Sequence, residues 1–316
     1  MGEWHGRAMA TEIEIRTVEP PGAPAGVERL DEAARRALAR FAEVERVCTR
    51  FQPDSPLMRF NRGGDGWQEV DPLLYRVVAL AARARRRTGG RFDPRVLEAL
   101  VRIGYDRTLP VGRGTLRLPA PQGRARPLRD SGWLQRRPRR RALRLRGAPL
   151  DLGGIGKGYA VRLAAREMAP VSGNFLVNAG GDLVCRGPGP EGDGWRVGVE
   201  DPRGGAAPVA VLAVRDRAVC TSSVRRRRWL AGDRPVHHLI DPRTGEPAAS
   251  GLLAVTVVGA DPAWCEVWSK ALFVEGATGV RELAERERLA ALWVTEEEEL
   301  GWSSRMAPFL IWRAAA

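Results

Sequence analysis

The hydrophobic positions of this chain follow helical spacing in four segments. Over residues 27–50 apolar side chains recur every three or four positions, with charged residues on the opposite face, which predicts an amphipathic helix. The same spacing predicts a second helix over residues 72–87, which ends at the glycine cap Thr88-Gly89-Gly90. Two further helices are predicted near the C-terminus, one running from Trp264 to Phe273 and one over residues 277–289.

Short alternating or apolar stretches bounded by turn residues predict strands. Residues 12–16 alternate like an edge strand, and residues 142–146 alternate again. Further strand candidates lie within residues 174–187, 195–202, 208–223, 237–245, 252–260, 291–295 and 309–312. Strands and helices are mixed without a strict βαβ rhythm, which predicts a fold of the α+β class.

Three stretches fit no regular element. Residues 1–11 are predicted to form a disordered N-terminal extension, with Met9 a candidate start, ahead of one domain over residues 12–316. Residues 51–66 are interpreted as a polar loop. Residues 113–138 are rich in Pro, Arg and Gly and are predicted to be the least structured part of the domain.

The composition is basic, and the kind of basic residue matters more than the amount. The formal net charge is +13, yet the chain contains 49 arginines and only two lysines, Lys157 and Lys270. Such a charge suits nucleic acid, an anionic membrane or phosphate ligands, but no helix-turn-helix, zinc-finger or RNA-binding signature accompanies it. Most of the arginines, the run Arg225–Arg228 included, are therefore interpreted as solvated surface, and no nucleic-acid partner is predicted.

Cysteine spacing and hydropathy exclude other classes. The four cysteines are far apart and form no C-x-x-C pair, which argues against a zinc site or a disulfide framework. No apolar run has membrane-spanning length, and the first residues lack an apolar signal core. The sequence therefore predicts a soluble, cytoplasmic protein with no membrane insertion.

One glycine-rich stretch, DLGGIGKGYAV from Asp151 to Val161, carries the first chemical signal. Its spacing excludes a Walker A loop, which needs a glycine where Asp151 stands and Ser or Thr where Gly158 stands, and it excludes the G-x-G-x-x-G turn. Bare backbone at a helix start still favours an anion, and Lys157 adds a compact positive charge. A phosphate or diphosphate site is one interpretation, and a tight strand-to-helix connection with an exposed lysine is the other.

Four further motifs decide between them. In chain order, the sequence contains TGGRFDP at Thr88, DLGGIGKGYAV at Asp151, NAGGD at Asn178, HHLIDPRTG at His237 and ALFVEG at Ala271. Together they resemble the ApbE family, the FAD:protein FMN transferases, from about residue 12 to the C-terminus. The resemblance implies an α+β fold of two related subdomains with the flavin site between them.

The resemblance also implies an activity. Such enzymes bind FAD with Mg²⁺, split its diphosphate, attach FMN through a phosphoester to a threonine or serine of a target flavoprotein, and release AMP. The alternative is a flavin-binding member of altered metal site, either an FAD hydrolase or a non-catalytic flavin carrier.

Motif positions imply roles for individual residues. His238 matches the general base that deprotonates the acceptor hydroxyl, Asp241 is expected to orient it, and His237 is interpreted as a neighbour only. The flavin and diphosphate are expected to contact Phe92, Asp93, Gly153, Gly154, Ile155, Gly156, Lys157, Asn178, Gly180, Gly181, Asp182 and Ser222. Trp264 and Trp268 are interpreted as core residues rather than a flavin stack.

The expected metal site departs from the family pattern. The family has a backbone carbonyl at the position of Gly156, an aspartate at that of Glu266, and a threonine or serine at that of Lys270. Glutamate can ligate Mg²⁺ with a shifted carboxylate, whereas an ammonium cannot ligate a metal at all. The sequence therefore predicts that Lys270 pairs with Glu266 and weakens or abolishes the need for Mg²⁺.

Overall fold

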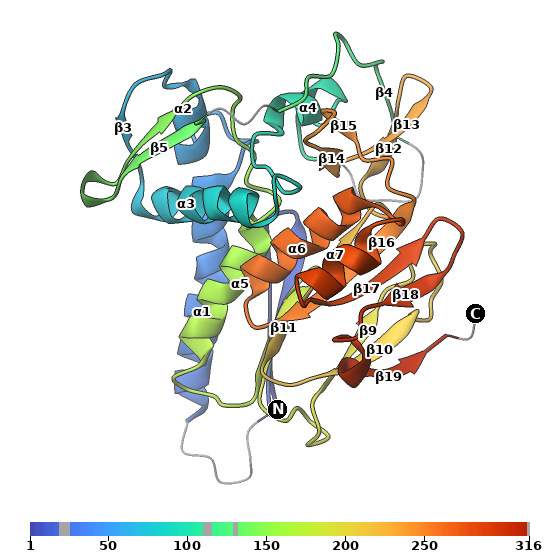
Figure 1. The fold of residues 1–316 in the computed structure, drawn as a ribbon. Coiled ribbons are helices and arrows are strands. Elements are labelled where there is room, and N and C mark those ends of the chain that lie inside the picture. The colour runs from blue at the N-terminus through green and yellow to red at the C-terminus, as the bar shows by residue number, and fades with distance from the viewer. Residues whose placement is uncertain (19–25, 110–115, 129–131, 315–316) are drawn as a thin grey trace.

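A computed structural model describes residues 1–18, 26–109, 116–128 and 132–314. The α+β class is confirmed: one large antiparallel sheet has helices on one face and a small sheet on the other (Figure 1). In spatial order the large sheet consists of β1 (Gly2–Ala8), β2 (Thr11–Thr17), β7 (Phe175–Ala179), β8 (Asp182–Arg186), β11 (Arg217–Ser223), β16 (Leu252–Gly259), β17 (Ala290–Thr295) and β18 (Leu300–Trp302).

Alternation along the strands builds two cores, one on each face of the sheet. In β7, Phe175 and Val177 point into the core beneath the helices, whereas Leu176 points into the core of the opposite face. That second core is closed by the three-stranded sheet β19-β10-β9, made of β9 (Trp195–Val199), β10 (Ala210–Val214) and β19 (Leu310–Arg313). Because β16 and β17 are covered on both faces, their sequences are nearly continuous apolar runs rather than alternating patterns.

Helices α1 (Val27–Cys48), α5 (Gly156–Met168), α6 (Pro262–Glu275) and α7 (Val280–Arg286) cover the other face (Figure 1). Helix α5 packs between α1 and α6, and glycine permits its close approach to α6. A Cβ on Gly158 would lie 2.4 Å from the carbonyl oxygen of Pro262, which is backbone and cannot turn aside. The glycine motif therefore begins a helix that must start against another helix.

Smaller elements gather at the end of the molecule drawn uppermost in Figure 1. They are α2 (Pro56–Arg62), α3 (Pro72–Arg87), α4 (Leu97–Arg102), β3 (Gln68–Glu69), β4 (Arg117–Leu118), β5 (Leu134–Arg137), β6 (Ala142–Leu145), β12 (Arg228–Ala231), β13 (Arg234–His237), β14 (Ile240–Asp241) and β15 (Glu246–Pro247). Trp229 anchors part of them, because its indole N–H donates to the carbonyl of Ile103 at 2.7 Å. The short helix η1 (Pro138–Arg140) lies between β5 and β6, and η2 (Ala307–Phe309) lies next to β10, just before β19.

Two stretches differ from the sequence prediction. Residues 2–8, predicted to be disordered, form the edge strand β1, because every residue from Gly2 to Ala8 pairs with β2 and its polar side chains face solvent. Strand β2 is consequently internal to the sheet rather than an edge. The predicted loop over residues 51–66 contains α2, which begins where Ser55 accepts a hydrogen bond from the Met58 amide. Of residues 113–138, positions 113–115 and 129–131 lie outside the described residues.

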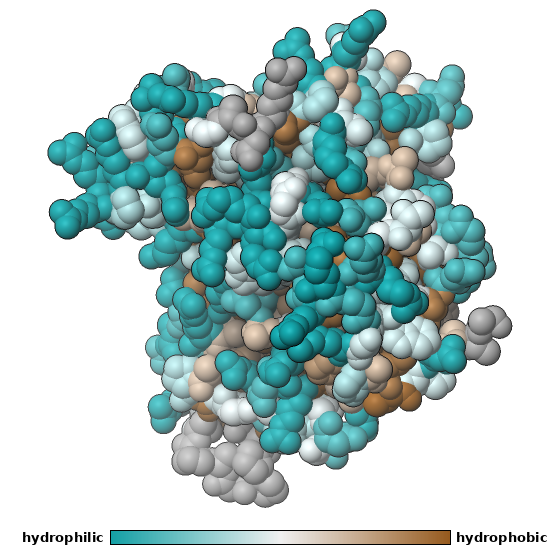
Figure 2. All heavy atoms as spheres, in the orientation of Figure 1, coloured by the Kyte–Doolittle hydropathy of each residue, from teal (hydrophilic) through white to brown (hydrophobic). Residues whose placement is uncertain are grey.

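The surface and the core agree with two other predictions. Figure 2 shows mostly hydrophilic side chains on the face that it draws, as expected for arginines spread over solvated surface. Trp268 is buried in the core under the helices, and Trp264 packs against that core, so both tryptophans are core residues. Within the described ranges no helix combines the length and the apolar character needed to cross a bilayer.

Candidate functional site

A cavity lies where the start of α5, the end of α1, the loop before α4, the β13–β14 connection and α6 meet. These segments come from all thirds of the chain, which explains why the motifs are widely separated in the sequence. Of the predicted site residues, the cavity is lined by Phe92, Asp93, Gly153, Gly154, Gly156, Lys157, His238 and Lys270. The structure therefore brings the glycine loop, the histidine and both lysines to one place.

The glycine loop lets neighbouring groups approach the backbone closely. A Cβ on Gly154 would lie 3.0 Å from the Phe92 ring and 3.3 Å from the Lys270 Cδ, so glycine lets both side chains lie against the main chain. Helix α5 begins at Gly156 behind Ile155, which provides no side-chain cap for the first amides. Ile155 itself is fully buried in the core and does not line the cavity. Of the first amides of α5, that of Gly156 donates to the Leu152 carbonyl at 2.9 Å and that of Gly158 to Glu266 at 2.8 Å, so it is the positive end of the helix dipole that favours an anionic ligand here.

Lys157 reaches from α5 to two buried carboxylates. Its ammonium forms an ion pair with Asp182, and it lies 3.9 Å from Glu266 Oε1. The other oxygen of Asp182 accepts a hydrogen bond from the Thr221 amide at 3.2 Å. Desolvation lowers the pKa of Lys157 to about 8, and the negative charge of Glu266 opposes that shift. The group is therefore mainly an ammonium at neutral pH.

Glu266 is buried and its carboxylate is shared among nitrogen donors. Its Oε2 accepts a hydrogen bond from the Gly158 amide at 2.8 Å, and its Oε1 lies 3.2 Å from the Lys270 ammonium. Mg²⁺ needs oxygen ligands in near-ideal geometry, and here both carboxylate oxygens of Glu266 already interact with nitrogen donors. No cluster of three or more His, Cys, Asp or Glu with metal-ligand geometry is present among the described residues. The residues at this position do not fit a Mg²⁺ site.

His238 places an unpartnered imidazole nitrogen beside the cavity. Its Nδ1 is buried and has no hydrogen-bond partner in the part of the chain that the structure describes. Burial lowers the pKa of His238 well below its ordinary value, and the charges of Arg227 and Lys270 lower it further. The ring is therefore neutral near pH 7, and a neutral imidazole nitrogen can accept a proton.

The neighbouring histidine has a structural role. His237 Nδ1 accepts from the Leu239 amide at 3.2 Å, its Nε2 lies 3.2 Å from the Ala248 carbonyl, and its ring meets Phe273 edge-on. Desolvation lowers the pKa of His237 to about 4. These contacts fix the β13–β14 connection that carries His238, as expected for a neighbour only.

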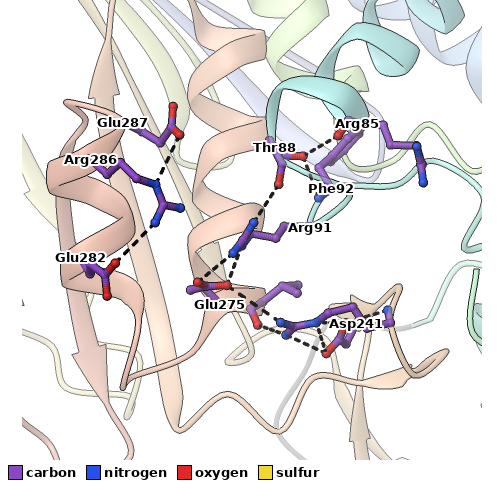
Figure 3. A network of polar contacts seen from close by, with 11 residues as sticks. Arg85, Thr88, Arg91, Phe92, Asp241, Glu275, Glu282, Arg286 and Glu287 are labelled. Carbon is purple, nitrogen blue, oxygen red and sulfur yellow. Dashed lines mark hydrogen bonds and ion pairs between the residues drawn. The ribbon is translucent and has the colours of Figure 1, made fainter. Parts of the chain in front are cut away.

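Asp241 does not orient His238. Its carboxylate accepts hydrogen bonds from the backbone and guanidinium of Arg243, at 2.8 and 2.9 Å, and no hydrogen bond joins Asp241 to His238 among the described residues. Arg243 also donates to the Val274 carbonyl, which ties this turn to the end of α6. In Figure 3 the turn at Asp241 lies next to Glu275 of α6. Asp241 instead stabilises the turn that follows His238 through its ion pair with Arg243, two residues further along the chain.

The NAGGD motif forms a hairpin turn rather than a wall of the cavity. Ala179 pairs with Asp182, so Gly180 and Gly181 are the two loop residues between β7 and β8, and both have positive φ, 63° and 95°. Asn178 closes the turn, because its Oδ1 accepts from the Gly181 amide at 3.0 Å. Of this motif, only Asp182 reaches the site residues, through Lys157.

Two other predicted contacts are occupied within the protein. Ser222 is buried, and its hydroxyl lies 2.7 Å from that of Ser269 in α6. Asp93 lines the cavity, but its carboxylate pairs with the guanidiniums of Arg85 and Arg95, each at 2.7 Å. Close to it, Thr88 Oγ1 accepts from the Phe92 amide, and Arg91 bridges this loop to Glu275 (Figure 3).

Arg50, which sequence reasoning missed, is the most constrained cation of the cavity wall. Its guanidinium pairs with Asp151 at 2.6 Å and lies over the rings of Phe51 and Tyr105, at 4.3 and 4.4 Å from their centroids. Its Nη2 is buried and has no hydrogen-bond partner among the described residues. Nothing in the periodicity marks this position, which follows the last turn of α1. Arg226 and Arg227, interpreted as solvated surface, also line the cavity.

Comparisons with known proteins agree with the motifs. The ApbE family model matches residues 9–293. The FAD:protein FMN transferase of Klebsiella pneumoniae (strain 342) is 29% identical over 88% of this chain and 82% of that relative. That of Salmonella typhimurium is 30% identical over 83% of this chain and 76% of the relative.

Solved structures share the fold. The ApbE protein of Thermotoga maritima superposes with a TM-score of 0.79 at 24% identity, over 98% of both chains. The flavin transferase ApbE from Vibrio cholerae gives 0.77 at 23% identity, over 98% of this chain and 99% of that one.

Proposed function

Because this chain belongs to the ApbE family, we propose that it is an FAD:protein FMN transferase. The observation that carries this proposal is the convergence of a glycine-rich helix start, two lysines and an unpartnered neutral imidazole nitrogen on one cavity. The acceptor would be a threonine or serine hydroxyl of a target flavoprotein. FMN would become attached through a phosphoester, and AMP would leave.

The reaction is phosphoryl transfer, in which positioning and neutralisation of charge carry most of the catalysis. The acceptor oxygen attacks the phosphorus on the FMN side of the FAD diphosphate, a new P–O bond forms, and the bridging P–O bond to AMP breaks. The hydroxyl proton goes to His238 Nδ1, which has no competing partner in the described part of the chain. The positive end of helix α5 and the Lys157 ammonium would hold the diphosphate.

Magnesium, which the resemblance implies as a cofactor, has no suitable set of ligands here. The Lys270 ammonium lies 3.2 Å from Glu266 Oε1, and the Gly158 amide donates a hydrogen bond to Oε2. No step of this mechanism therefore runs through a metal ion.

An adduct measurement tests the transfer. The protein is co-expressed, in a host that lacks its own flavin transferase, with an acceptor subunit of a redox complex that carries a Ser/Thr acceptor motif. Intact-mass spectrometry should show the acceptor heavier by one FMN less one water, and the shift should vanish when the acceptor threonine is replaced by valine. Equal release of FMN and AMP without any adduct would identify a hydrolase, and bound flavin without turnover would identify a carrier.

We expect Arg50 to contribute to nucleotide binding through its free Nη2. In Arg50→Lys the charge that pairs with Asp151 is kept, whereas the second donor and the guanidinium contact with the rings of Phe51 and Tyr105 are lost. A hydrogen bond to a charged group contributes about 1.5–3 kcal/mol, so FAD affinity should fall about 10- to 100-fold by calorimetry.

Arg203→Lys is the control at a more exposed ion pair, since Arg203 pairs with Asp201 at 2.8 Å and does not line the cavity. It should leave FAD affinity unchanged. Equal affinities of Arg50→Lys and the unchanged protein would contradict a ligand contact for Arg50.

A further inference from the structure

The only two lysines of the chain meet at one carboxylate oxygen. Lys270 of α6 and Lys157 of α5 lie 3.2 and 3.9 Å from Glu266 Oε1, although the other 49 basic side chains are arginine. Both lysines line the cavity, and each side chain is about a fifth exposed. The two ammonium groups are therefore held by a buried acid and still open toward the space where a ligand would bind.

Lysine differs from arginine in a way that fits this place. An ammonium is a compact point charge with three donors, whereas a guanidinium is a planar fork that spans a carboxylate. Lys270 uses one donor on Glu266, which leaves others for phosphate oxygens. Its stem packs against the backbone of Gly154, so that its amine is placed from the same side as the glycine loop.

The surrounding charges add to this arrangement. Asp182 and Glu266 balance the two ammonium charges. Of the other charged side chains that line the cavity, four are positive (Arg50, Arg91, Arg226 and Arg227) and three are negative (Glu45, Asp93 and Asp151), which leaves one positive charge in excess. A diphosphate with two negative charges therefore meets a site whose positive groups are already in place.

We propose that Lys270 and Lys157 form a fixed cationic clamp that takes the place of a divalent ion, so that this protein binds the diphosphate of FAD without metal. The proposal rests on the flavin-transfer function argued above. In the reaction, the N–H groups of Lys270 stabilise the charge that develops on the departing AMP phosphate as the bridging P–O bond breaks. The acceptor proton still goes to His238, so the clamp neither gains nor loses a proton.

Calorimetry with ADP and with FAD tests the clamp on the unmodified protein. After chelation of metals, the dissociation constants should change by no more than about twofold when Mg²⁺ is added. Electron paramagnetic resonance with Mn²⁺ should show no stoichiometric ion held with FAD. A loss of affinity above about tenfold in the chelator, or a bound Mn²⁺ at one per chain, would overturn the proposal.

Variants of Lys270 separate charge from ligation. Lys270→Met should lose about 10- to 100-fold in ADP affinity, with no recovery in Mg²⁺ or Mn²⁺, because it removes a charged donor and offers no oxygen. Lys270→Thr combined with Glu266→Asp restores the family residues, and it should bind ADP in a metal-dependent way with Mn²⁺ visible by resonance. Circular dichroism of each variant checks folding. An unchanged ADP affinity in a folded Lys270→Met variant would contradict the clamp.

The binding readouts separate this proposal from the proposed function. Metal-independent binding of ADP and FAD without any FMN adduct would refute the transfer and leave the clamp. An FMN adduct whose formation stops on chelation would refute the clamp and leave the transfer.

Discussion

Replacing His238 with asparagine is expected to slow FMN transfer about 10²- to 10⁴-fold while FAD remains bound. The imidazole Nδ1 lies buried at the cavity without a hydrogen-bond partner among the described residues, so its removal deletes the proton acceptor and leaves the groups around the diphosphate in place. Single-turnover transfer measured by mass spectrometry gives the rate, and calorimetry gives the FAD affinity. A His238→Asn variant that transfers at the original rate would show that another group takes the proton.

The imidazole ring of His238 also determines how the transfer rate of the unmodified protein depends on pH. Burial and the charges of Arg227 and Lys270 lower the pKa of His238 well below 6.5, so the neutral base is present at pH 7 and is lost as the pH falls through that lowered pKa. Transfer should therefore stay constant from pH 7 to pH 6.5 and decline below that range, and it should also decline above pH 7 as the Lys157 ammonium, whose pKa is about 8, is lost. His238→Gly with imidazole in the buffer should recover part of the transfer rate, and the pH below which the rate declines should move up toward the pKa of free imidazole.

His237→Asn should chiefly lower the melting temperature, because His237 contacts backbone.

The periodicity of the sequence predicts the long elements well, because their burial is one-sided and regular. Helix α3 begins and ends where the spacing and the glycine cap place it, and α1 ends two residues earlier than expected. Strand β1 was missed because an edge strand with alternating polar residues has no apolar signal of its own and depends on its pairing with β2. Helix α2 was missed although Ser55-Pro56 is a good helix start, since polar residues and glycines surround it.

The residues of the candidate site could be predicted where the backbone determines their place. They were harder to predict where contacts between side chains determine it. The glycines of the loop, His238 and both lysines, which the motifs single out, line one cavity, and their contacts with flavin stay a prediction. The partners of Asp241 and Asp93 could not be predicted, because a carboxylate in a motif looks the same in the sequence whether it faces a ligand or a nearby arginine. Asn178 and the two glycines after it carry a hairpin signal as strong as their ligand signal, and the structure has the hairpin. Arg50 depends on Asp151 and Tyr105, which only the fold brings next to it.

Asp93→Asn is expected to lower the free energy of unfolding by about 3–5 kcal/mol, the largest stability change predicted for this chain. The Asp93 side chain is about 1% exposed and lies between the guanidiniums of Arg85 and Arg95, each 2.7 Å away. A neutral amide removes the negative charge between two buried positive groups. Denaturant unfolding followed by circular dichroism measures the change.

The same variant separates two interpretations of Asp93. Its position in the TGGRFDP motif and on the cavity wall predicts a flavin contact, whereas its ion pairs indicate that it holds the loop carrying Phe92 against α3. A structural role predicts a large loss of stability with FAD affinity reduced only as far as the loop moves. A direct contact predicts weaker FAD binding at nearly unchanged stability. Asp201→Asn is the control, because its pair with the 39% exposed Arg203 lies near the surface and should contribute at most about 1 kcal/mol. If Asp93→Asn and Asp201→Asn lower the free energy of unfolding by the same small amount, the buried ion pairs of Asp93 do not stabilise the fold, and its carboxylate is available to bind the ligand.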